Sequence, residues 1–263
     1  MTFLFLFLVF IFGLAIGSFL NVCIYRLPAH KSLLRPGSHC PACGTPIKPY
    51  DNIPLLSYLF LLGRCRHCKI RIPLRYPAVE LLTGVLFVAL AVTSGLTVQL
   101  LISCLLVSSL IVITFIDLDL SIIPDRITVS GMIVGLLCSF FNARLGSGWS
   151  AVLTSGIGLF VGGVLYYVIA VLGSILFKKE SMGGGDIKLA AMLGAFLGWK
   201  GILLTSFFAF FLGAIIGGIV LLASSQRSHT RIPFGPFLAM GAVVYIFSGD
   251  FILNAYWQLA TSG

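Results

Sequence analysis

Charge is scarce in this chain of 263 residues. Only 10% of the residues are charged and only eight are acidic, whereas 59% are hydrophobic. This composition excludes an ordinary water-soluble domain, in which about a quarter of the residues are charged. The apolar residues occur in long runs, and runs of roughly 17 to 25 apolar residues cross a bilayer as helices, because a helix satisfies its own backbone hydrogen bonds. We therefore predict an all-α polytopic membrane protein.

The first apolar run lacks the features of a cleaved secretion signal. No basic residue precedes it and no small-residue cleavage site follows it, so we interpret it as a retained span. The remaining apolar runs bring the prediction to about eight transmembrane helices, of which the sixth is short. They cover approximately residues 3–24, 78–94, 98–116, 127–141, 151–176, 187–199, 201–224 and 234–257.

Basic residues are concentrated in one loop, between the first and second predicted helices. Nine of the seventeen Lys and Arg residues fall between residues 26 and 75, in a chain of formal net charge +9. Basic loops of membrane proteins stay in the cytoplasm, so membrane orientation explains the positive charge, and no nucleic-acid partner is expected. With eight spans the other basic loops also lie inside, and only Arg144 and Lys200 are left outside.

The same loop holds two CxxC pairs, CPAC at residues 40–43 and CRHC at residues 65–68. Two such turns complete a tetrahedral zinc site, and four protein ligands leave no open position for catalysis. We therefore predict a small cytoplasmic loop with a structural zinc held by Cys40, Cys43, Cys65 and Cys68. The alternatives are disulfides, which a reducing cytoplasm disfavours, and His39 or His67 as substitute ligands. The other cysteines, Cys23, Cys104 and Cys138, are expected to be packing residues.

Ionisable residues at membrane depth are expensive to bury and are therefore candidates for function. Asp117 ends the third predicted span, and Asp186 follows the glycines of SMGGGDIKLA at residues 181–190. The predicted topology puts both at cytoplasmic helix ends, where two carboxylates can meet. Such a pair resists double ionisation, so one holds a proton while the other stays charged, as a general acid and base on a shared water require. This is the chemistry of aspartic peptidases.

Two neighbouring acids are weaker candidates. Asp119 lies about 200° round the helix from Asp117 and would face elsewhere, and Asp125 follows Pro124, where a helix-capping role is expected. For Asp117 the alternative is a solvated carboxylate at a helix end. The three glycines before Asp186 let the backbone turn sharply and a substrate strand approach closely. They have neither GxGxxG spacing nor a GK[ST] ending, which argues against nucleotide binding.

Five motifs in a fixed order carry a more specific resemblance. They are GSFLNVCIYRLP, the paired CxxC loop, FIDLDLSIIPD, GGGD followed by IKLAAMLGAFLGW, and RIPFGPFLAMG. Together they resemble the bacterial prepilin leader peptidases, the bifunctional type IV prepilin peptidase and N-methyltransferase enzymes. The resemblance covers nearly the whole chain, and the GGGD motif is also similar to the wider GxGD class of membrane aspartic proteases. Many relatives have a bulkier residue between the glycines.

The resemblance implies cleavage of the short basic leader of type IV prepilins or pseudopilins at the cytoplasmic face of the bacterial inner membrane. It implies Asp117 and Asp186 as the catalytic pair and methylation of the new N-terminal amine with S-adenosylmethionine, for which the sequence has no signature of its own. The substrates would serve type IV pilus or type II secretion systems. Methyl-transfer residues are expected in the N-terminal half, with Asn21, Gly63 and Glu80 as candidates. Their alternatives are an interhelical hydrogen bond, a turn, and a carboxylate at a helix N-terminus.

We predict three parts of the chain. The first transmembrane helix covers residues 1–25, the basic zinc loop covers residues 26–76, and a transmembrane aspartic peptidase domain covers residues 77–263. The rival interpretation is a polytopic transporter or a secretion-assembly scaffold with a structural zinc loop. Transporters often have an inverted repeat and acids near the bilayer midplane, whereas these carboxylates cluster at one membrane face. The lipid bilayer is the expected surrounding, and the sequence does not indicate an oligomeric state.

Overall fold

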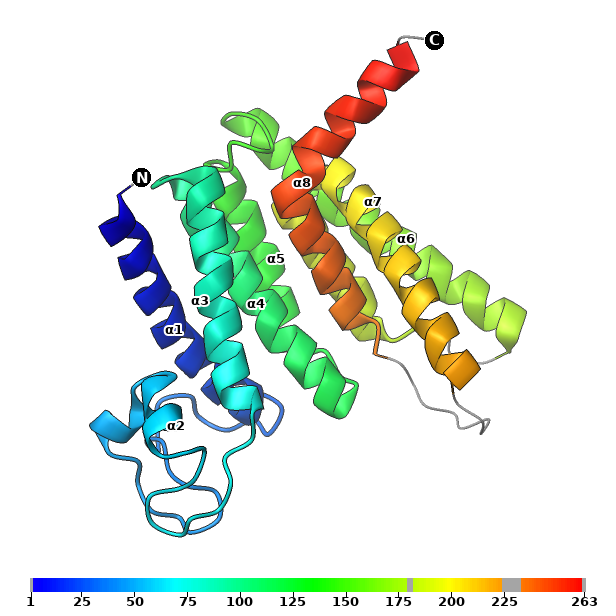
Figure 1. Cartoon of the computed structure of the whole chain (residues 1–263). Helices are drawn as coiled ribbons and strands as arrows, with labels where there is room; N and C mark the ends of the chain where they lie inside the picture. The colour runs from blue at the N-terminus through cyan, green and yellow to red at the C-terminus, as the bar shows by residue number, and fades with distance from the viewer. Residues whose placement is uncertain (1, 179–181, 224–232, 262–263) are drawn as a thin grey trace. The chain divides into compact units, whose positions relative to one another are not determined.

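The computed structural model describes residues 2–178, 182–223 and 233–261, and these residues form helices and loops without a β-strand. The predicted all-α class is therefore confirmed. The helices are α1 (Phe3–Arg26), the short 3-10 helix η1 (Pro49–Asn52), α2 (Leu56–Phe60), α3 (Arg75–Ser94), α4 (Val98–Leu120), α5 (Asp125–Ser139), α6 (Trp149–Phe177), α7 (Gly184–Ala223) and α8 (Gly235–Thr261), labelled in Figure 1 where there is room.

Six of the described helices, α1, α3, α4, α6, α7 and α8, are long and apolar enough to cross a membrane. The difference from the eight expected spans has two sources, α5 and α7. The fourth corresponds to α5, which has 15 residues and is shorter than a usual span. The sixth and seventh lie within α7, which is broken at Gly198, where φ is 71° and ψ is 177°. Glycine adopts this φ without a steric cost. The break lies close to the boundary that the sequence predicts between the two spans.

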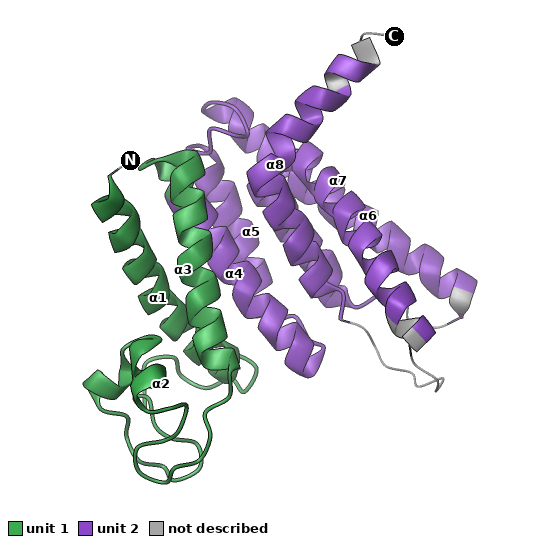
Figure 2. Cartoon of the chain, viewed as in Figure 1, with its two compact units in different colours: residues 1–100 green, residues 101–263 purple. Residues whose placement is uncertain are grey.

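The chain divides into two compact units, residues 1–100 and residues 101–263, coloured separately in Figure 2. In unit 1, α1 packs along α3. A Cβ atom at Gly13 would lie 2.7 Å from the Cα of Gly84, and one at Gly17 would lie 2.7 Å from the Cα of Glu80. Small residues four positions apart allow helix backbones in a membrane to approach this closely, so the two backbones are in direct contact.

The loop between α1 and α3 contains two turns of the same design, one for each CxxC pair. The Cys40 N–H donates to the Thr45 carbonyl at 3.0 Å, and the Cys65 N–H donates to the Ile70 carbonyl at 2.9 Å. In each turn the residue after the second cysteine has a positive φ, of 69° in the first and 59° in the second. The two pairs therefore adopt matching local structures, and both present their sulfurs inside a tight turn.

Unit 2 is organised around α7, which packs against α5, α6 and α8. The closest of these contacts is with α6 (Figure 1), where a Cβ at Gly194 would lie 2.0 Å from the carbonyl oxygen of Gly158. No side chain fits between the helices at this point. Because lipid provides no hydrophobic driving force between helices, their association depends on van der Waals packing. The close backbone contact provides such packing between α6 and α7.

Candidate functional site

Asp117 lies in the last turn of α4 and is only 5% exposed. Its Oδ2 accepts the backbone N–H of Gly235, the first residue of α8, at 2.9 Å. Free N–H groups and the helix dipole favour a carboxylate at a helix N-terminus. A Cβ at position 235 would lie 2.6 Å from this oxygen, so glycine leaves the room that the carboxylate needs. Gly235 therefore positions Asp117, a link that the sequence analysis missed.

Asp186 lies in the first turn of α7 and is half-buried, after the exposed Gly183 and Gly184. A Cβ at Gly185 would lie 2.8 Å from the side chain of Ile123, so the start of α7 packs directly on the segment that follows α4. This packing brings the end of α4 and the start of α7 to the same end of unit 2. The structure therefore places the two candidate aspartates at the same end of unit 2.

The two neighbouring acids lie in different surroundings. The side chain of Asp119 is exposed, in contrast to that of Asp117. Asp125 is also exposed and accepts a hydrogen bond from the Nζ of Lys188 at 2.7 Å. The expected capping role of Asp125 is wrong, because the N-cap of α5 is Pro124 and no side-chain hydrogen bond caps this helix. The ion pair instead ties the SIIPD motif to the helix that carries Asp186.

An aromatic wall with one hydroxyl borders the aspartates. Tyr166 of α6 is fully buried, and its hydroxyl is hydrogen-bonded to the Oγ of Ser206 at 3.2 Å. Its ring stacks on Phe210, with the centroids 5.8 Å apart, and lies 6.3 Å from the ring of Phe234, the residue before Gly235. Sequence reasoning missed Tyr166, because a tyrosine within an apolar helix resembles any packed aromatic residue.

The four predicted zinc ligands form one cluster. The Sγ atoms of Cys40, Cys43, Cys65 and Cys68 all lie within 4.8 Å of one another, and no disulfide joins them. A tetrahedral zinc with bonds of about 2.3 Å requires sulfurs about 3.8 Å apart, and the Sγ atoms of Cys40 and Cys68 are 3.8 Å apart. Among the described residues, neither His39 nor His67 belongs to this cluster. The donor set and its spacing therefore fit zinc.

The protonation of the thiols supports the same conclusion. Hydrogen bonding to Thr45 lowers the pKa of the Cys43 thiol to about 6. The backbone N–H of Ile70 lowers the pKa of Cys68, but desolvation and the neighbouring sulfurs raise it overall, to about 11. Four sulfurs this close repel one another as thiolates, and a bound divalent cation removes that conflict because metal binding releases the thiol protons.

The three methyl-transfer candidates of unit 1 do not form one cluster. Gly63 is a turn residue of the loop with φ of 65°. Asn21 of α1 donates from Nδ2 to the Tyr76 carbonyl of α3 at 3.0 Å, which is the interhelical bond given above as its alternative. Glu80 is 9% exposed on α3, and its Oε2 accepts the backbone N–H of Leu55 at 2.9 Å. Asn21 and Glu80 thus lie on the facing sides of two packed helices.

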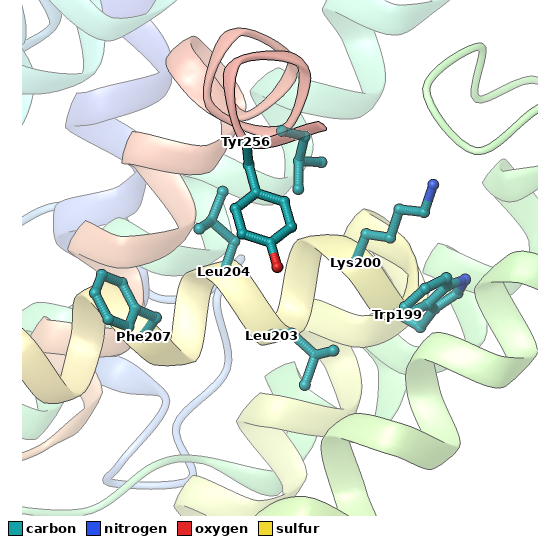
Figure 3. A pocket seen from close by; sticks show the side chains of 7 residues that line it. Trp199, Lys200, Leu203, Leu204, Phe207 and Tyr256 are labelled. Atoms are coloured by element: carbon teal, nitrogen blue, oxygen red, sulfur yellow. The ribbon is translucent and has the colours of Figure 1, made fainter. Parts of the chain in front are cut away.

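Unit 2 also has a shallow cavity of about 290 Å³ between α7 and α8, away from the aspartates. Its lining includes Trp199 and Lys200 of α7, and the Tyr256 side chain of α8 lies above α7 beside Leu204 (Figure 3). The break in α7 at Gly198 follows Asp186 by twelve residues, which is about 18 Å of helix, and Trp199 lies beyond this break. This apolar cavity therefore lies outside the candidate active site.

Two family models match the chain. The bacterial peptidase A24 N-terminal domain matches residues 11–94, and the type IV leader peptidase family matches residues 104–218. Glu80 and the four cysteines fall in the first match, and both candidate aspartates fall in the second. No solved structure matches the chain significantly.

Curated relatives carry the name prepilin leader peptidase/N-methyltransferase. The chain is 39% identical to that of Aeromonas salmonicida strain A449, over 97% of this chain and 94% of the relative, and 34% identical to that of Bacillus subtilis strain 168, over 96% and 98%. The relative from Myxococcus xanthus strain DK1622 is 44% identical over 85% of this chain, which spans 65% of that relative's length. The chain therefore belongs to the type IV leader peptidase family, the family of prepilin leader peptidase and N-methyltransferase enzymes, and is an enzyme of that family.

Proposed function

We propose that this enzyme cleaves the basic leader from type IV prepilins or pseudopilins with Asp117 and Asp186, and then methylates the new N-terminal amine with S-adenosylmethionine. The observation that carries the peptidase half is the placement of two carboxylates, which are 69 positions apart in the sequence, at one end of unit 2. The family membership supports both halves. No comparison supports the rival interpretation, a transporter or a scaffold.

The two aspartates act as one unit on a shared water. Mutual repulsion leaves one carboxyl protonated and the other charged. The charged carboxylate removes a proton from the water, and the protonated carboxyl polarises the scissile carbonyl. Because such a pair titrates jointly, neither role belongs to a single residue. The Gly235 N–H fixes the Asp117 carboxylate, and the exposed Gly183 and Gly184 leave the side of Asp186 open to an extended substrate.

The enzyme is a multi-pass protein of the bacterial inner membrane, and we propose that its active site faces the cytoplasm. The support is the basic loop at residues 26–75, because Lys and Arg are retained on the cytoplasmic side. The four clustered cysteines would hold a structural zinc, which supplies no chemistry and closes the two turns of the loop against each other. We keep the division into residues 1–25, 26–76 and 77–263 as a proposal.

Single-turnover cleavage of a synthetic prepilin tests the aspartate pair. Asp117→Asn and Asp186→Asn should each abolish cleavage, and the double variant should lose little more, because residues that act as a unit are not additive. Asp119→Asn is the matched control, since its carboxylate is exposed in the same helix turn. Strong cleavage by folded Asp186→Asn, or loss of cleavage in Asp119→Asn with an active Asp117→Asn, would contradict the assignment.

A second experiment separates the two reactions. If methyl transfer belongs to the N-terminal half, Asp117→Asn should still methylate a synthetic pilin that already lacks its leader. Incorporation of a labelled methyl group from S-adenosylmethionine measures this directly. Loss of both reactions in a folded Asp117→Asn protein would indicate one shared centre instead.

A further inference from the structure

Unit 1 contains a buried carboxylate that the peptidase reaction does not use. Residues 1–100 have only two acidic side chains, Asp51 and Glu80. Asp51 is bound to Arg66 at 2.6 Å in the exposed part of the loop. Glu80 is 9% exposed, and no ion pair of the described residues in unit 1 includes it. A buried carboxylate without a cation is expensive unless it is otherwise stabilised, so the contacts of Glu80 indicate its role.

The carboxylate has a neutral donor. The Leu55 N–H donates to Oε2 at 2.9 Å. Leu55 has φ of 59° and ψ of −50°, and the Leu56 N–H donates to the Pro54 carbonyl at 2.6 Å across it. This is a γ-turn with a positive φ, a strained conformation for leucine. The N–H that donates to Glu80 is therefore presented by a strained turn.

A second acceptor without a donor lies on the facing helix. Asn21 is 4% exposed, and its Oδ1 has no hydrogen-bond partner, although its Nδ2 donates to the Tyr76 carbonyl. Tyr76 and Glu80 are one helical turn apart on α3, as Gly17 and Asn21 are on α1, and Gly17 touches the backbone of Glu80. The carboxylate and the orphan amide oxygen thus lie within about one turn of each other. Buried acceptors without donors call for a ligand that carries N–H groups.

We propose that Glu80 is the proton acceptor of the methyl-transfer reaction and that, with Asn21 Oδ1, it binds the N-terminal amine of the trimmed pilin. The proposal rests on the methyltransferase half of the proposed function. The amine lone pair forms a bond to the methyl carbon of the sulfonium donor, and the electron pair of the breaking C–S bond stays on sulfur, which becomes a thioether. The proton released from the amine nitrogen passes to the Glu80 carboxylate and then to water.

The other titratable groups of unit 1 fit this role less well. His30, His39 and His67 are exposed in the loop, and the clustered cysteines have the spacing of zinc ligands. Glu80 is the sixth residue of α3, close to the point where the basic loop ends and α3 begins. A trimmed pilin, whose apolar helix lies in the bilayer, would present its N-terminus at this depth.

Glu80→Gln tests the proposal in the full-length protein, because glutamine keeps an acceptor oxygen for the Leu55 N–H but cannot take the proton at neutral pH. With a synthetic trimmed pilin peptide and S-adenosylmethionine both saturating, the single-turnover methylation rate should fall by about 100-fold or more. Cleavage of a synthetic prepilin by the same preparation should be unchanged, which also verifies its fold. Asn21→Ala should raise the KM for the peptide more than it lowers kcat.

Ser57→Ala is the matched control for a loosened loop. Its Oγ accepts the Ile53 N–H at 2.9 Å and donates to the Tyr50 carbonyl at 3.0 Å, and neither of these hydrogen bonds involves Glu80. A Ser57→Ala loss equal to that of Glu80→Gln would assign Glu80 to loop packing and overturn the proposal, as would wild-type methylation by Glu80→Gln. A wild-type enzyme that cleaves prepilin but methylates no trimmed peptide would instead remove the methyltransferase function itself, and this inference with it.

Discussion

Gly235→Ala is the sharpest test of how Asp117 is held. The backbone of Gly235 does not have a positive φ, so alanine fits the local conformation, but its Cβ would lie 2.6 Å from the Asp117 Oδ2. The carboxylate must move away and loses the 2.9 Å hydrogen bond from the Gly235 N–H. A hydrogen bond to a charged group contributes about 1.5 to 3 kcal/mol. If that amount is lost from the transition state, the cleavage rate falls roughly 10- to 150-fold.

Single-turnover cleavage of a synthetic prepilin at saturating enzyme measures this loss, with thermal unfolding in detergent as a check on the fold. Gly156→Ala is the matched control, since Gly156 lies within α6 and a Cβ there would meet nothing within 4 Å. Gly156→Ala should cleave at the wild-type rate. Wild-type cleavage by folded Gly235→Ala would refute the role of the α8 N-terminus, and an equal loss in both variants would point to a general effect of added methyl groups.

Three further changes have distinct expected outcomes. Metal analysis should find about one zinc per chain, lost when Cys40 and Cys65 are both changed to Ser, and a metal-free wild type would refute the cluster. Asp125→Asn should retain substantial cleavage activity, because the pair with Lys188 is exposed and such pairs stabilise by about 1 kcal/mol or less; complete loss would give Asp125 a catalytic role. Gly194→Val should prevent folding of unit 2, since its side chain would enter the backbone of α6, and a folded variant with a normal unfolding temperature would contradict this packing.

The helices could be predicted closely, because a helix that crosses the hydrocarbon core of a bilayer needs a long apolar run. The break at Gly198 lies near the end of the expected sixth span, residues 187–199, and so separates it from the seventh. The sixth apolar run is shorter than a usual membrane span. The two CxxC turns could be predicted in the same way, because the spacing of the two cysteines within each pair already indicates a tight turn. The helix bounds and the CxxC turns depend on residues close together in the chain. They can therefore be predicted without knowing which helices pack against each other.

Contacts between distant segments could not be predicted in the same way. In lipid both the packed face and the lipid-facing side of a helix are apolar, so periodicity does not identify the face that carries contacts. Tyr166 and Gly235 lie in segments without a local signal for their partners, Ser206 and Asp117. The expected cap at Asp125 failed for the same reason, because its partner Lys188 lies 63 residues away and becomes a neighbour only after α7 packs against the segment that follows α4.

The two aspartates have different surroundings, and this difference indicates the side from which a substrate arrives. Asp117 is almost fully buried and is held by the rigid N-terminus of α8. Asp186 is half-buried and follows two exposed glycines, which present backbone rather than side chains to the outside. We therefore expect an extended peptide to approach along this glycine segment. In the proposed mechanism the Asp117 carboxylate would lie behind the water and the Asp186 carboxylate beside the scissile bond, so that the glycines precede the aspartate nearer the substrate.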